Sequence, residues 1–509
     1  GGTLRLSCVG LDGWRRETVV SGREATATGE GLRWRLGLTP REDRELWLSY
    51  RFAASEPEDR PPPARRRTAG RVARRAVRDA EAWLADRARI ETDDELVDRV
   101  LRRSLLDLRL LVSDLDGQPY VAAGVPWYAT LFGRDALICA LQVMAFDGSL
   151  AAGTLRLLAA HQGSRRDDRH DEEPGRIIHE LRLGELARVD RTPLTRYYGT
   201  VDATPLFLIL LCRQVAWTGS TNLLSELRPA VDAAGADSDG DGLIEYRRRA
   251  PGGLEHQGWK DSSDGICDED GRPLAPPIAL AEAQAYAIRA REEVAALLDH
   301  LGERGRAEEL RRRALHGRAA LEALWLPDMQ AYAMALDGAK RPSRALASNQ
   351  GHLLWARAIP SGRASAVRDR LMSPGLFSGW GVRTLAVDEA AFNPVGYHTG
   401  SVWPHDSAIA AAGLREYGFD ADFRRVTEGL LDAAAAFHEY RLPELFAGFS
   451  RDDYEAPVPY PVACRPQAWA AGSVPYLLTC ALGLEPDALA GRLRLRRPTL
   501  PRQLNAVTV

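Results

Sequence analysis

The lengths of the connections between predicted helices constrain the fold of this chain more than any other feature of its sequence. After residue 90, apolar residues recur with the helical period in about twelve segments, and the connections alternate between very short and long. Short connections such as Phe146-Asp147-Gly148 and Gly418-Phe419-Asp420 force the helices that they join to lie antiparallel. All the long loops then lie at one end. We predict a mainly α fold, a closed (α/α)6 barrel with one functional end, against the alternative of an open helical solenoid.

The predicted helices span residues 93–113, 133–146, 149–161, 202–217, 221–235, 278–300, 302–324, 349–358, 362–373, 402–417, 420–440 and 465–482. Most of the tryptophan, tyrosine and histidine residues fall in the long loops between them. Long loops inside a compact domain usually carry function, so these loops contain our candidate site residues.

The first 60 residues have the period of strands instead. Alternating apolar positions run through Leu32, Trp34, Leu36 and Leu38, and a second series includes Tyr50. We predict a partial antiparallel β-sandwich over residues 1–60, a linker and connecting helix over 61–90, and a catalytic barrel over 91–509. A proline-rich stretch around residue 60 marks the linker.

Composition excludes several classes of protein. The net charge is −3, from 67 Lys+Arg and 70 Asp+Glu residues, and the two signs are interspersed along the chain. This balance argues against nucleic acid as a partner. No apolar run is long enough to span a membrane. The six cysteines lie far apart without CxxC spacing, so we predict reduced thiols in a cytoplasmic protein. The chain begins with Gly1-Gly2, so we expect it to be a fragment. What precedes Gly1, including any signal peptide, is left open, and so is the oligomeric state.

Two acidic residues lie in long loops rich in aromatic and turn-forming residues. Asp261 lies in the loop 257–265, and Glu444 lies in the loop 441–448. Two carboxyl groups on converging loops are what acid–base cleavage of a glycosidic bond requires. Asp264 is a rival of Asp261 for the acid role, because both lie in the same loop.

The first long loop is suited to binding a sugar. Arg134 and Asp135 offer hydrogen-bond donors beside acceptors, a combination that recognises neighbouring hydroxyl groups, although Arg-Asp at a helix start is also an ordinary capping arrangement. Trp127, Tyr128 and Phe132 are candidates to stack on the apolar faces of sugar rings.

The remaining candidate residues come from three other loops. They are Tyr198, Asp202, Trp259, Lys260, His398, Trp403 and His405. For Asp202, capping of the next helix is the competing explanation. The ammonium of Lys260 is expected to point toward sugar hydroxyls or another acid, since it would otherwise lower the pKa of its neighbour Asp261.

No metal site is predicted. His398 and His405 lack a third ligand at the spacing that zinc requires. Residues 237–242 resemble the start of a calcium-binding loop, but the twelfth position is Arg248 instead of a bidentate glutamate. We interpret this segment as a tight acidic turn, with calcium binding left open.

Four motifs together resemble the amylo-α-1,6-glucosidase domain of glycogen debranching enzymes. They are Phe132-Gly-Arg-Asp135, Trp259-Lys-Asp261, His398-Thr-Gly-Ser-Val-Trp-Pro-His405 and Leu442-Pro-Glu-Leu445. The layout is more distantly similar to glucoamylases, trehalases and other six-hairpin glycosidases. The resemblance covers about residues 90 to 485. The N-terminal strands look like the end of the sandwich that precedes this barrel in bacterial relatives.

The resemblance implies an inverting hydrolase of α-linked glucosides that needs no cofactor. It implies that Asp261 is the general acid and Glu444 the general base. It also implies that Arg134 and Asp135 bind the non-reducing terminal glucose. Phe132 departs from the tryptophan that is more usual at its position, which puts the platform under the sugar in question. In an inverting enzyme the two carboxyl groups lie about 6.5–9.5 Å apart, which is the separation expected here.

Two other functions are compatible with these residues. An inverting phosphorylase would replace water with phosphate, would need a basic pocket, and would not need Glu444 as a base. A non-catalytic carbohydrate-binding protein would keep the sugar contacts without turnover. Natural substrate and linkage are not specified by the motifs.

Overall fold

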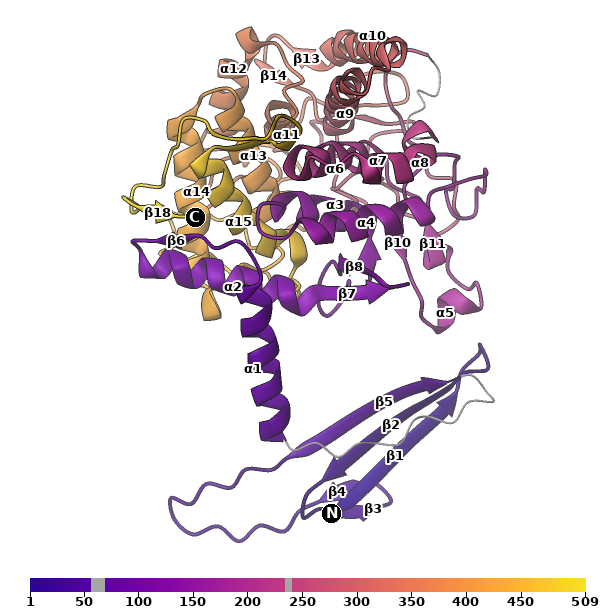
Figure 1. Ribbon diagram of the computed structural model, residues 1–509, viewed down its shortest axis with the longest axis vertical. Coiled ribbons are helices and arrows are strands. Elements are labelled where there is room, and N and C mark those ends of the chain that lie inside the picture. Colours follow the sequence, from indigo (N-terminus) through magenta and orange to yellow (C-terminus); the bar gives the residue numbers. More distant parts are fainter. Residues whose placement is uncertain (56–68, 234–239) are drawn as a thin grey trace. The chain divides into compact units, whose positions relative to one another are not determined.

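The computed structural model describes residues 1–55, 69–233 and 240–509. The chain divides into two compact units (Figure 1). The smaller unit comprises Gly1–Asp86 and Leu183–Thr195, and the larger one comprises Arg87–Arg182 and Arg196–Val509. The predicted linker around residue 60 lies outside the described residues.

The smaller unit is built on one antiparallel sheet. Its strands are β1 (Gly2–Val9), β2 (Arg15–Gly22) and β5 (Leu48–Ser55), in the order β1-β2-β5. A separate hairpin pairs β3 (Thr26–Thr28) with β4 (Gly31–Arg33), and the unit also contains helices α1 (Ala69–Ala85) and α5 (Glu185–Arg188).

The strand predicted through Leu36 and Leu38 is wrong. The structure has no strand between β4 and β5, and these two side chains are 48% and 58% exposed. Alternating apolar residues form a strand only where a neighbouring strand pairs with the backbone and another layer covers the apolar side. Neither condition is met here.

The larger unit contains a ring of buried helices. These are α3 (Gly133–Gln142), α6 (Ala203–Thr218), α9 (Ala281–His300), α11 (Asn349–Trp355), α13 (Pro404–Glu416) and α15 (Ala468–Leu482). Each packs against the next, and α15 packs against α3, which closes the ring. Nearly every residue of α3 and α13 is buried, because these helices have neighbours on both sides and behind them.

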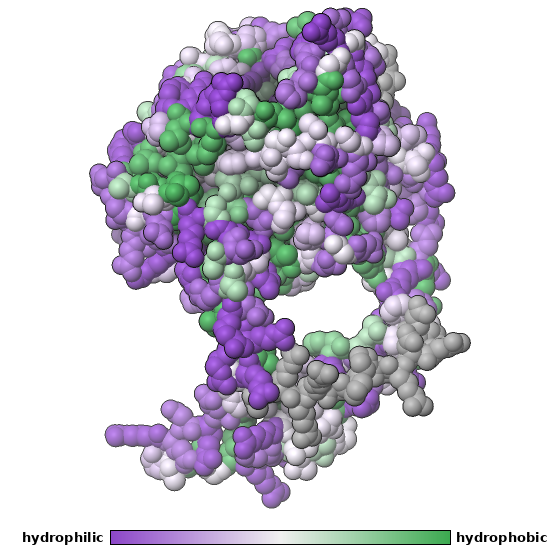
Figure 2. Space-filling view, in the orientation of Figure 1, coloured by the Kyte–Doolittle hydropathy of each residue, from purple (hydrophilic) through white to green (hydrophobic). Residues whose placement is uncertain are grey.

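Further helices cover the outside of this ring. They are α2 (Glu95–Leu111) on α15, α4 (Gly148–Ala160) on α3 and α6, α7 (Asn222–Glu226) on α6, α8 (Arg228–Ala233) beside α7, α10 (Arg304–Leu321) on α9, α12 (Ser361–Leu371) on α11, and α14 (Asp420–Ala436) on α13. The face of the helical unit seen in Figure 2 combines hydrophilic areas with hydrophobic patches. The unit is therefore mainly helical, in agreement with the predicted class.

One predicted helix is divided in the structure. The segment 221–235 forms α7 and α8, which are separated at Leu227. Pro229 follows two residues later and has no amide hydrogen to donate to the carbonyl of Ser225, and its ring would clash with that carbonyl in a continuous helix.

Short strands connect the long loops to the helices. They are β6 (Glu91–Thr92) with β18 (Val507–Thr508), β7 (Val112–Leu115) with β8 (Gln118–Val121), β9 (Leu131–Phe132) and β11 (Arg196–Tyr197) on either side of β10 (Glu180–Leu181), β12 (Ala279–Leu280) with β15 (Ala335–Leu336), β13 (Trp325–Leu326) with β14 (Ala331–Tyr332), and β16 (Leu484–Asp487) with β17 (Arg492–Leu495). All are antiparallel pairings.

In the described ranges, no helix is long and apolar enough to cross a membrane. All six cysteines lie in these ranges, and each carries a free thiol.

Close packing between α11 and α13 gives a test of the ring. A Cβ added to Gly351 would clash with Ala410 on the facing helix, whereas one added to Gly362 of α12 would meet open space. We expect Gly351→Ala to lower the free energy of unfolding by about 1–3 kcal/mol. Gly362→Ala is the matched control and should leave stability unchanged or raise it by up to about 1 kcal/mol. Urea unfolding of the two variants measures both values, and equal stabilities would contradict the packing.

Candidate active site

Four of the six ring helices begin at or beside residues of the candidate site. Arg134 and Asp135 lie in the first turn of α3, Asp202 immediately precedes α6, His405 lies in the first turn of α13, and Gln467 immediately precedes α15. The amino end of a helix carries a partial positive charge, so this arrangement favours carboxylates at this end of the ring.

Arg134 is the central ion of the cluster and is only 1% exposed. Its Nε donates to Asp202 Oδ2 at 2.8 Å, and its Nη2 donates to Thr200 Oγ1 at 3.2 Å. Its Nη1 lies 3.5 Å from Asp261 Oδ2. Arg134 thus links two helix starts to the loop that carries Asp261. A planar guanidinium can hold three such partners at once, which an ammonium cannot do in fixed geometry.

The Asp261 carboxyl lies at the edge of this cluster, with 27% of its side chain exposed. Burial raises the pKa of Asp261 to about 6, against the opposing effect of the Arg134 guanidinium, and the nearby Asp202 carboxylate raises this pKa further. Asp261 therefore keeps its proton at a pH at which an ordinary aspartate has lost it.

Glu444 is held by two donors. Tyr397 Oη donates to Glu444 Oε1 at 2.6 Å, and the backbone amide of Cys464 donates to Oε2 at 2.9 Å. Burial raises the pKa of Glu444, while these two hydrogen bonds act in the opposite direction. The charge of Asp261 also raises the pKa of Glu444, so the two carboxyl groups lie close enough to interact.

A second tyrosine extends this arrangement. Tyr128 Oη lies 3.2 Å from Tyr397 Oη, and the negative charges of both Glu444 and Asp261 raise the pKa of Tyr128, in addition to the larger effect of burial. The Tyr128 hydroxyl therefore lies in the region that both candidate carboxyls influence.

Asp135 is a further acid in the same place. It is 6% exposed, and burial raises its pKa to about 8 although Arg134 is adjacent. Gln467 Nε2 lies 3.4 Å from Asp135 Oδ1. A carboxyl that keeps its proton near neutral pH can both donate to and accept from sugar hydroxyls.

Edge-to-face contacts between rings support the loop that carries Asp261. Trp259 contacts His398, Trp403 and His405 with centroid separations of 5.0 to 5.8 Å. His398 Nδ1 lies 2.8 Å from Ser262 Oγ, directly after Asp261 in the chain. Burial lowers the pKa values of both histidines well below the usual value, so both are neutral. All four rings are at most 2% exposed, so they position the loop and offer little surface to a ligand.

Lys260 does not point into the solvent-accessible part of the site. Its ammonium is fully buried, and it donates to Asn349 Oδ1 at 2.8 Å and to the Thr384 carbonyl at 2.7 Å. Asn349 in turn donates to Glu282. Burial lowers the pKa of Lys260 to about 8. In this structure Lys260 connects α11 to the Asp261 loop. Of the two alternatives that we expected, a contact with sugar hydroxyls is not available to it, whereas the charges of Asp406 and Glu282 do act on its ammonium.

Three other candidates lie in different settings. Tyr198 is buried, and its hydroxyl donates to the carbonyl of His161 at 2.9 Å, away from the carboxyl pair. Phe132 is 7% exposed and makes an edge contact with the ring of Tyr128. Trp127 is 57% exposed, and its indole nitrogen donates to the carbonyl of Val462. Of the candidate stacking residues, Trp127 alone presents a large open surface.

The rival acid and the acidic turn fall outside the cluster. Asp264 is exposed and accepts from the Ser262 hydroxyl. Residues 237–239 lie outside the described residues, and Asp241 forms an ion pair with Lys340. Within the described ranges there is no group of three or more metal-ligating side chains.

Sequence reasoning missed the contacts made by Tyr397, Thr200 and Gln467. Tyr397 directly precedes His398 in a loop that we had singled out, but nothing in the spacing indicates that its hydroxyl turns to a carboxylate 47 residues later. Thr200 and Gln467 lie just before helix starts, and this position is the only signal that could have found them.

Comparisons with known proteins bear on the class of this protein. Residues 228–454 match the family model of the mannosylglycerate hydrolase MGH1-like glycoside hydrolase domain. A search of curated protein sequences finds no match. The fold resembles the GH63 mannosylglycerate hydrolase of Thermus thermophilus, solved with Tris and D-glycerate, with a TM-score of 0.56 and 16% identity over 74% of this chain and 99% of that one.

Two further solved structures are similar. A sialidase matches with a TM-score of 0.62 and 11% identity, over 84% of this chain and 38% of that one. A rhamnosidase from Klebsiella oxytoca matches with a TM-score of 0.53 and 15% identity, over 77% of this chain and 65% of that one. At such identities these likenesses show the fold alone. Together with the family model, they identify the chain as an enzyme that carries a glycoside hydrolase domain.

Proposed function

We propose that this enzyme is an inverting glycoside hydrolase that cleaves α-glucosidic bonds on an (α/α)6 barrel. The single observation that carries this proposal is the pair of electrostatically coupled carboxyl groups, Asp261 and Glu444. One keeps its proton to about pH 6, and the other is held by a tyrosine and a backbone amide.

In the proposed reaction, Asp261 donates its proton to the glycosidic oxygen as the bond to the anomeric carbon breaks. Glu444 accepts a proton from a water molecule on the opposite face of the sugar, and the oxygen of that water forms the new bond to the anomeric carbon. A second carboxyl that activates water in this way inverts the anomeric configuration, and the required separation of about 6.5–9.5 Å remains our prediction for this pair.

The surrounding residues have distinct proposed roles. Arg134 has its guanidinium engaged by Asp202, Thr200 and Asp261, so it orients the acid more than it contacts sugar directly. Asp135 is the better candidate to bind sugar hydroxyls. Trp127 is placed to stack on a sugar ring at the edge of the site.

Debranching-type α-1,6-glucosidase activity is the specific reaction that we propose, on glycogen-like or oligosaccharide substrates. The acidic character of the site supports an uncharged substrate. Asp135, Asp202 and Glu444 all lie near Asp261. The two cations there already have protein partners, because Arg134 bonds to two carboxyl groups and the buried Lys260 bonds to Asn349.

A second candidate function is hydrolysis of a glycosylglycerate. It is favoured by the family model over residues 228–454 and by the similar fold of mannosylglycerate hydrolase. This substrate carries a carboxylate and would need a cation near the leaving group. A panel of α-1,6, α-1,4, α-1,2 and α,α-1,1 glucosides, together with mannosylglycerate and glucosylglycerate, distinguishes the two. Turnover confined to the glycerates would overturn the first proposal.

The same panel, run with and without inorganic phosphate, tests the remaining alternatives. A hydrolase releases free glucose in the absence of phosphate. Sugar phosphate formed only when phosphate is present would indicate a phosphorylase. Binding without turnover of any compound would indicate a carbohydrate-binding protein.

Removing either carboxyl should strongly lower turnover. Asp261→Asn and Glu444→Gln should each lower kcat by about 10²–10⁴-fold, because each loses one proton-transfer group. Asp264→Asn is the matched control from the same loop, and it should leave kcat within about two-fold of the wild type, since a substitution away from the reacting groups has little effect. Steady-state kinetics on the preferred glucoside measures all three. A large loss of kcat in D264N, together with near wild-type kcat in D261N, would assign the general acid to Asp264 instead of Asp261.

The Tyr397 hydroxyl should position the base and hold its pKa down. Tyr397→Phe removes a hydrogen bond to a charged acceptor, worth about 1.5–3 kcal/mol, and should lower kcat by about 10–100-fold. The acidic limb of the pH profile should move to higher pH, because the lost hydrogen bond favours the ionised carboxylate.

Tyr460→Phe is the control for this variant, because the Tyr460 ring lies 5.9 Å from that of Tyr397. It should leave the acidic limb in place. A merely structural role of Tyr397 would lower kcat without moving that limb.

Activity should fall on the alkaline side of about pH 6. Asp261 acts as an acid only while it is protonated, and its pKa is raised to about 6. Above this pH, kcat/KM should fall by about ten-fold for each pH unit. The pH dependence of kcat/KM reports the pKa of the acid in the free enzyme. The pH dependence of kcat/KM from pH 4 to 9 measures it. A value that stays constant up to pH 8.5 would contradict the assignment of Asp261.

A further inference from the structure

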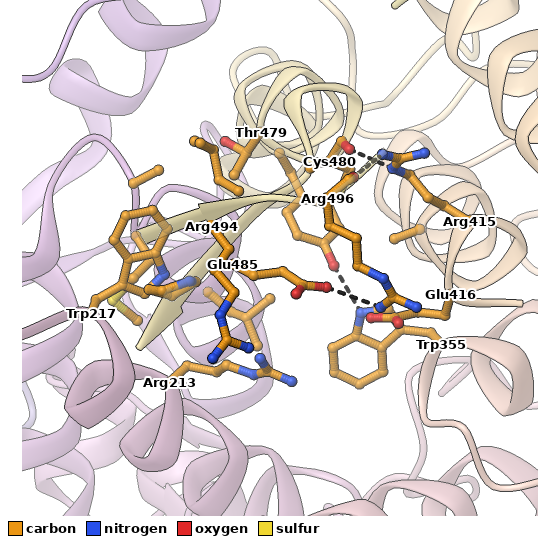
Figure 3. A pocket seen from close by; sticks show the side chains of 18 of the residues that line it. Arg213, Trp217, Trp355, Arg415, Glu416, Thr479, Cys480, Glu485, Arg494 and Arg496 are labelled. Atoms are coloured by element: carbon orange, nitrogen blue, oxygen red, sulfur yellow. Dashed lines mark hydrogen bonds and ion pairs between the residues drawn. The ribbon is translucent and has the colours of Figure 1, made fainter. Parts of the chain in front are cut away.

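A cavity lies at the opposite end of the ring helices from the carboxyl pair. It has a volume of about 420 Å³ and is lined by the last turns of the ring helices and by the β16–β17 hairpin (Figure 3). Asp202 precedes α6 at the candidate active site, whereas Trp217 near the end of α6 lines this cavity. At a rise of 1.5 Å per residue, the two ends of α6 are roughly 20 Å apart.

The lining of this cavity is rich in arginine. Its arginines are Arg213, Arg289, Arg357, Arg415, Arg494, Arg496 and Arg497. Its acidic residues are Glu416, Glu485 and Asp487. The cavity is therefore more basic than the carboxyl-rich candidate active site.

Two of these arginines stabilise the ends of helices. Arg289 Nη1 donates to the carbonyl of Trp355 at 2.6 Å, and Arg415 Nε donates to the carbonyl of Cys480 at 2.6 Å. Both bonds reach carbonyl groups at the ends of helices, of which that of Cys480 also accepts from the Gly483 amide, and both offset the negative end of the helix dipole. Helix capping thus accounts for these two residues.

Capping does not account for Arg213 and Arg494. The Arg213 and Arg289 side chains both donate to the same atom, Glu293 Oε1, so one carboxylate serves two guanidinium groups. Arg494 lies 3.5 Å from Asp487, and both side chains of this pair are substantially exposed, at 56% and 38%. Such an exposed pair is worth little, and Arg494 can exchange its partner for another anion.

An indole ring and an unpartnered amide lie in the same cavity. Arg213, Arg494 and Trp217 point into the same part of it in Figure 3. Gln142 also lines the cavity and is 1% exposed, and neither its amide nitrogen nor its amide oxygen has a hydrogen-bond partner among the described residues. A buried amide without partners costs free energy, which a ligand with hydroxyl groups would recover.

We propose that this cavity binds a phosphomonoester carried on a ring, either a sugar phosphate or a nucleoside monophosphate. The guanidinium groups of Arg213 and Arg494 bind the phosphate, for which their planar donor pattern is suited. Trp217 stacks on the ring, and Gln142 binds a hydroxyl group. This ligand goes beyond the proposed function, whose substrate is an uncharged glucoside at the other end of the ring.

Calorimetric titration of the full chain tests this proposal with four probes: glucose 6-phosphate, AMP, inorganic phosphate and glucose. We expect one or both phosphomonoesters to bind at least ten-fold more tightly than inorganic phosphate or glucose. The ratio of the Kd values for glucose 6-phosphate and AMP shows which ring the cavity prefers. Arg494→Gln and Trp217→Ala should each raise the Kd of the more tightly bound phosphomonoester at least five-fold.

Two controls locate the binding. Arg492→Gln changes an exposed arginine of the same strand β17 that does not line the cavity, and it should leave the affinity unchanged. The double variant D261N/E444Q should bind the phosphomonoester as tightly as the wild type. Circular dichroism and the Tm of each variant show that it is folded.

Three results would overturn the proposal. One is that inorganic phosphate binds as tightly as the phosphomonoesters, and another is that R494Q and W217A, both folded, bind like the wild type. The third is loss of binding in D261N/E444Q, which would place the ligand at the candidate active site. The proposed hydrolase function would survive all three, because it depends on turnover of neutral glucosides.

Discussion

The buried guanidinium of Arg134 is the interaction on which the candidate active site depends. It lies in the first turn of α3 and bonds to Asp202 before α6, to Thr200 and to Asp261. Removing one member of such a buried network leaves an uncompensated charge, which typically costs about 3–5 kcal/mol. Arg134 therefore fixes the position of the acid loop relative to two ring helices.

Burial around this ion explains why neighbouring acids behave differently. The pKa of Asp261 is raised to about 6 although it contacts Arg134, and that of the more deeply buried Asp135 is raised to about 8. Burial also raises the pKa of Glu444, but two donors that favour its ionised form oppose this rise. Environments that separate the pKa values of nearby carboxyl groups are how one site can contain both an acid and a base.

The sequence predicted the parts of this fold that depend on local chemistry. The helix pairs with tight links were predictable because Gly219, Gly302 and Gly418 take positive φ angles of 68°, 82° and 84° at those turns, which glycine adopts most readily. Loop context and motifs singled out Asp261 and Glu444, whose catalytic roles are a proposal. Side-chain direction was not. Lys260 turns to Asn349, 89 residues away, and Tyr198 turns to His161, and neither contact leaves a local signal.

The anomeric configuration of the first product tests the central claim most directly. Proton NMR during the first minutes of hydrolysis, before the sugar equilibrates, distinguishes the two anomers of glucose. If Asp261 protonates the leaving group while Glu444 activates water on the opposite face, an α-glucoside yields β-glucose. Initial release of α-glucose would require a covalent or same-face mechanism and would contradict this account.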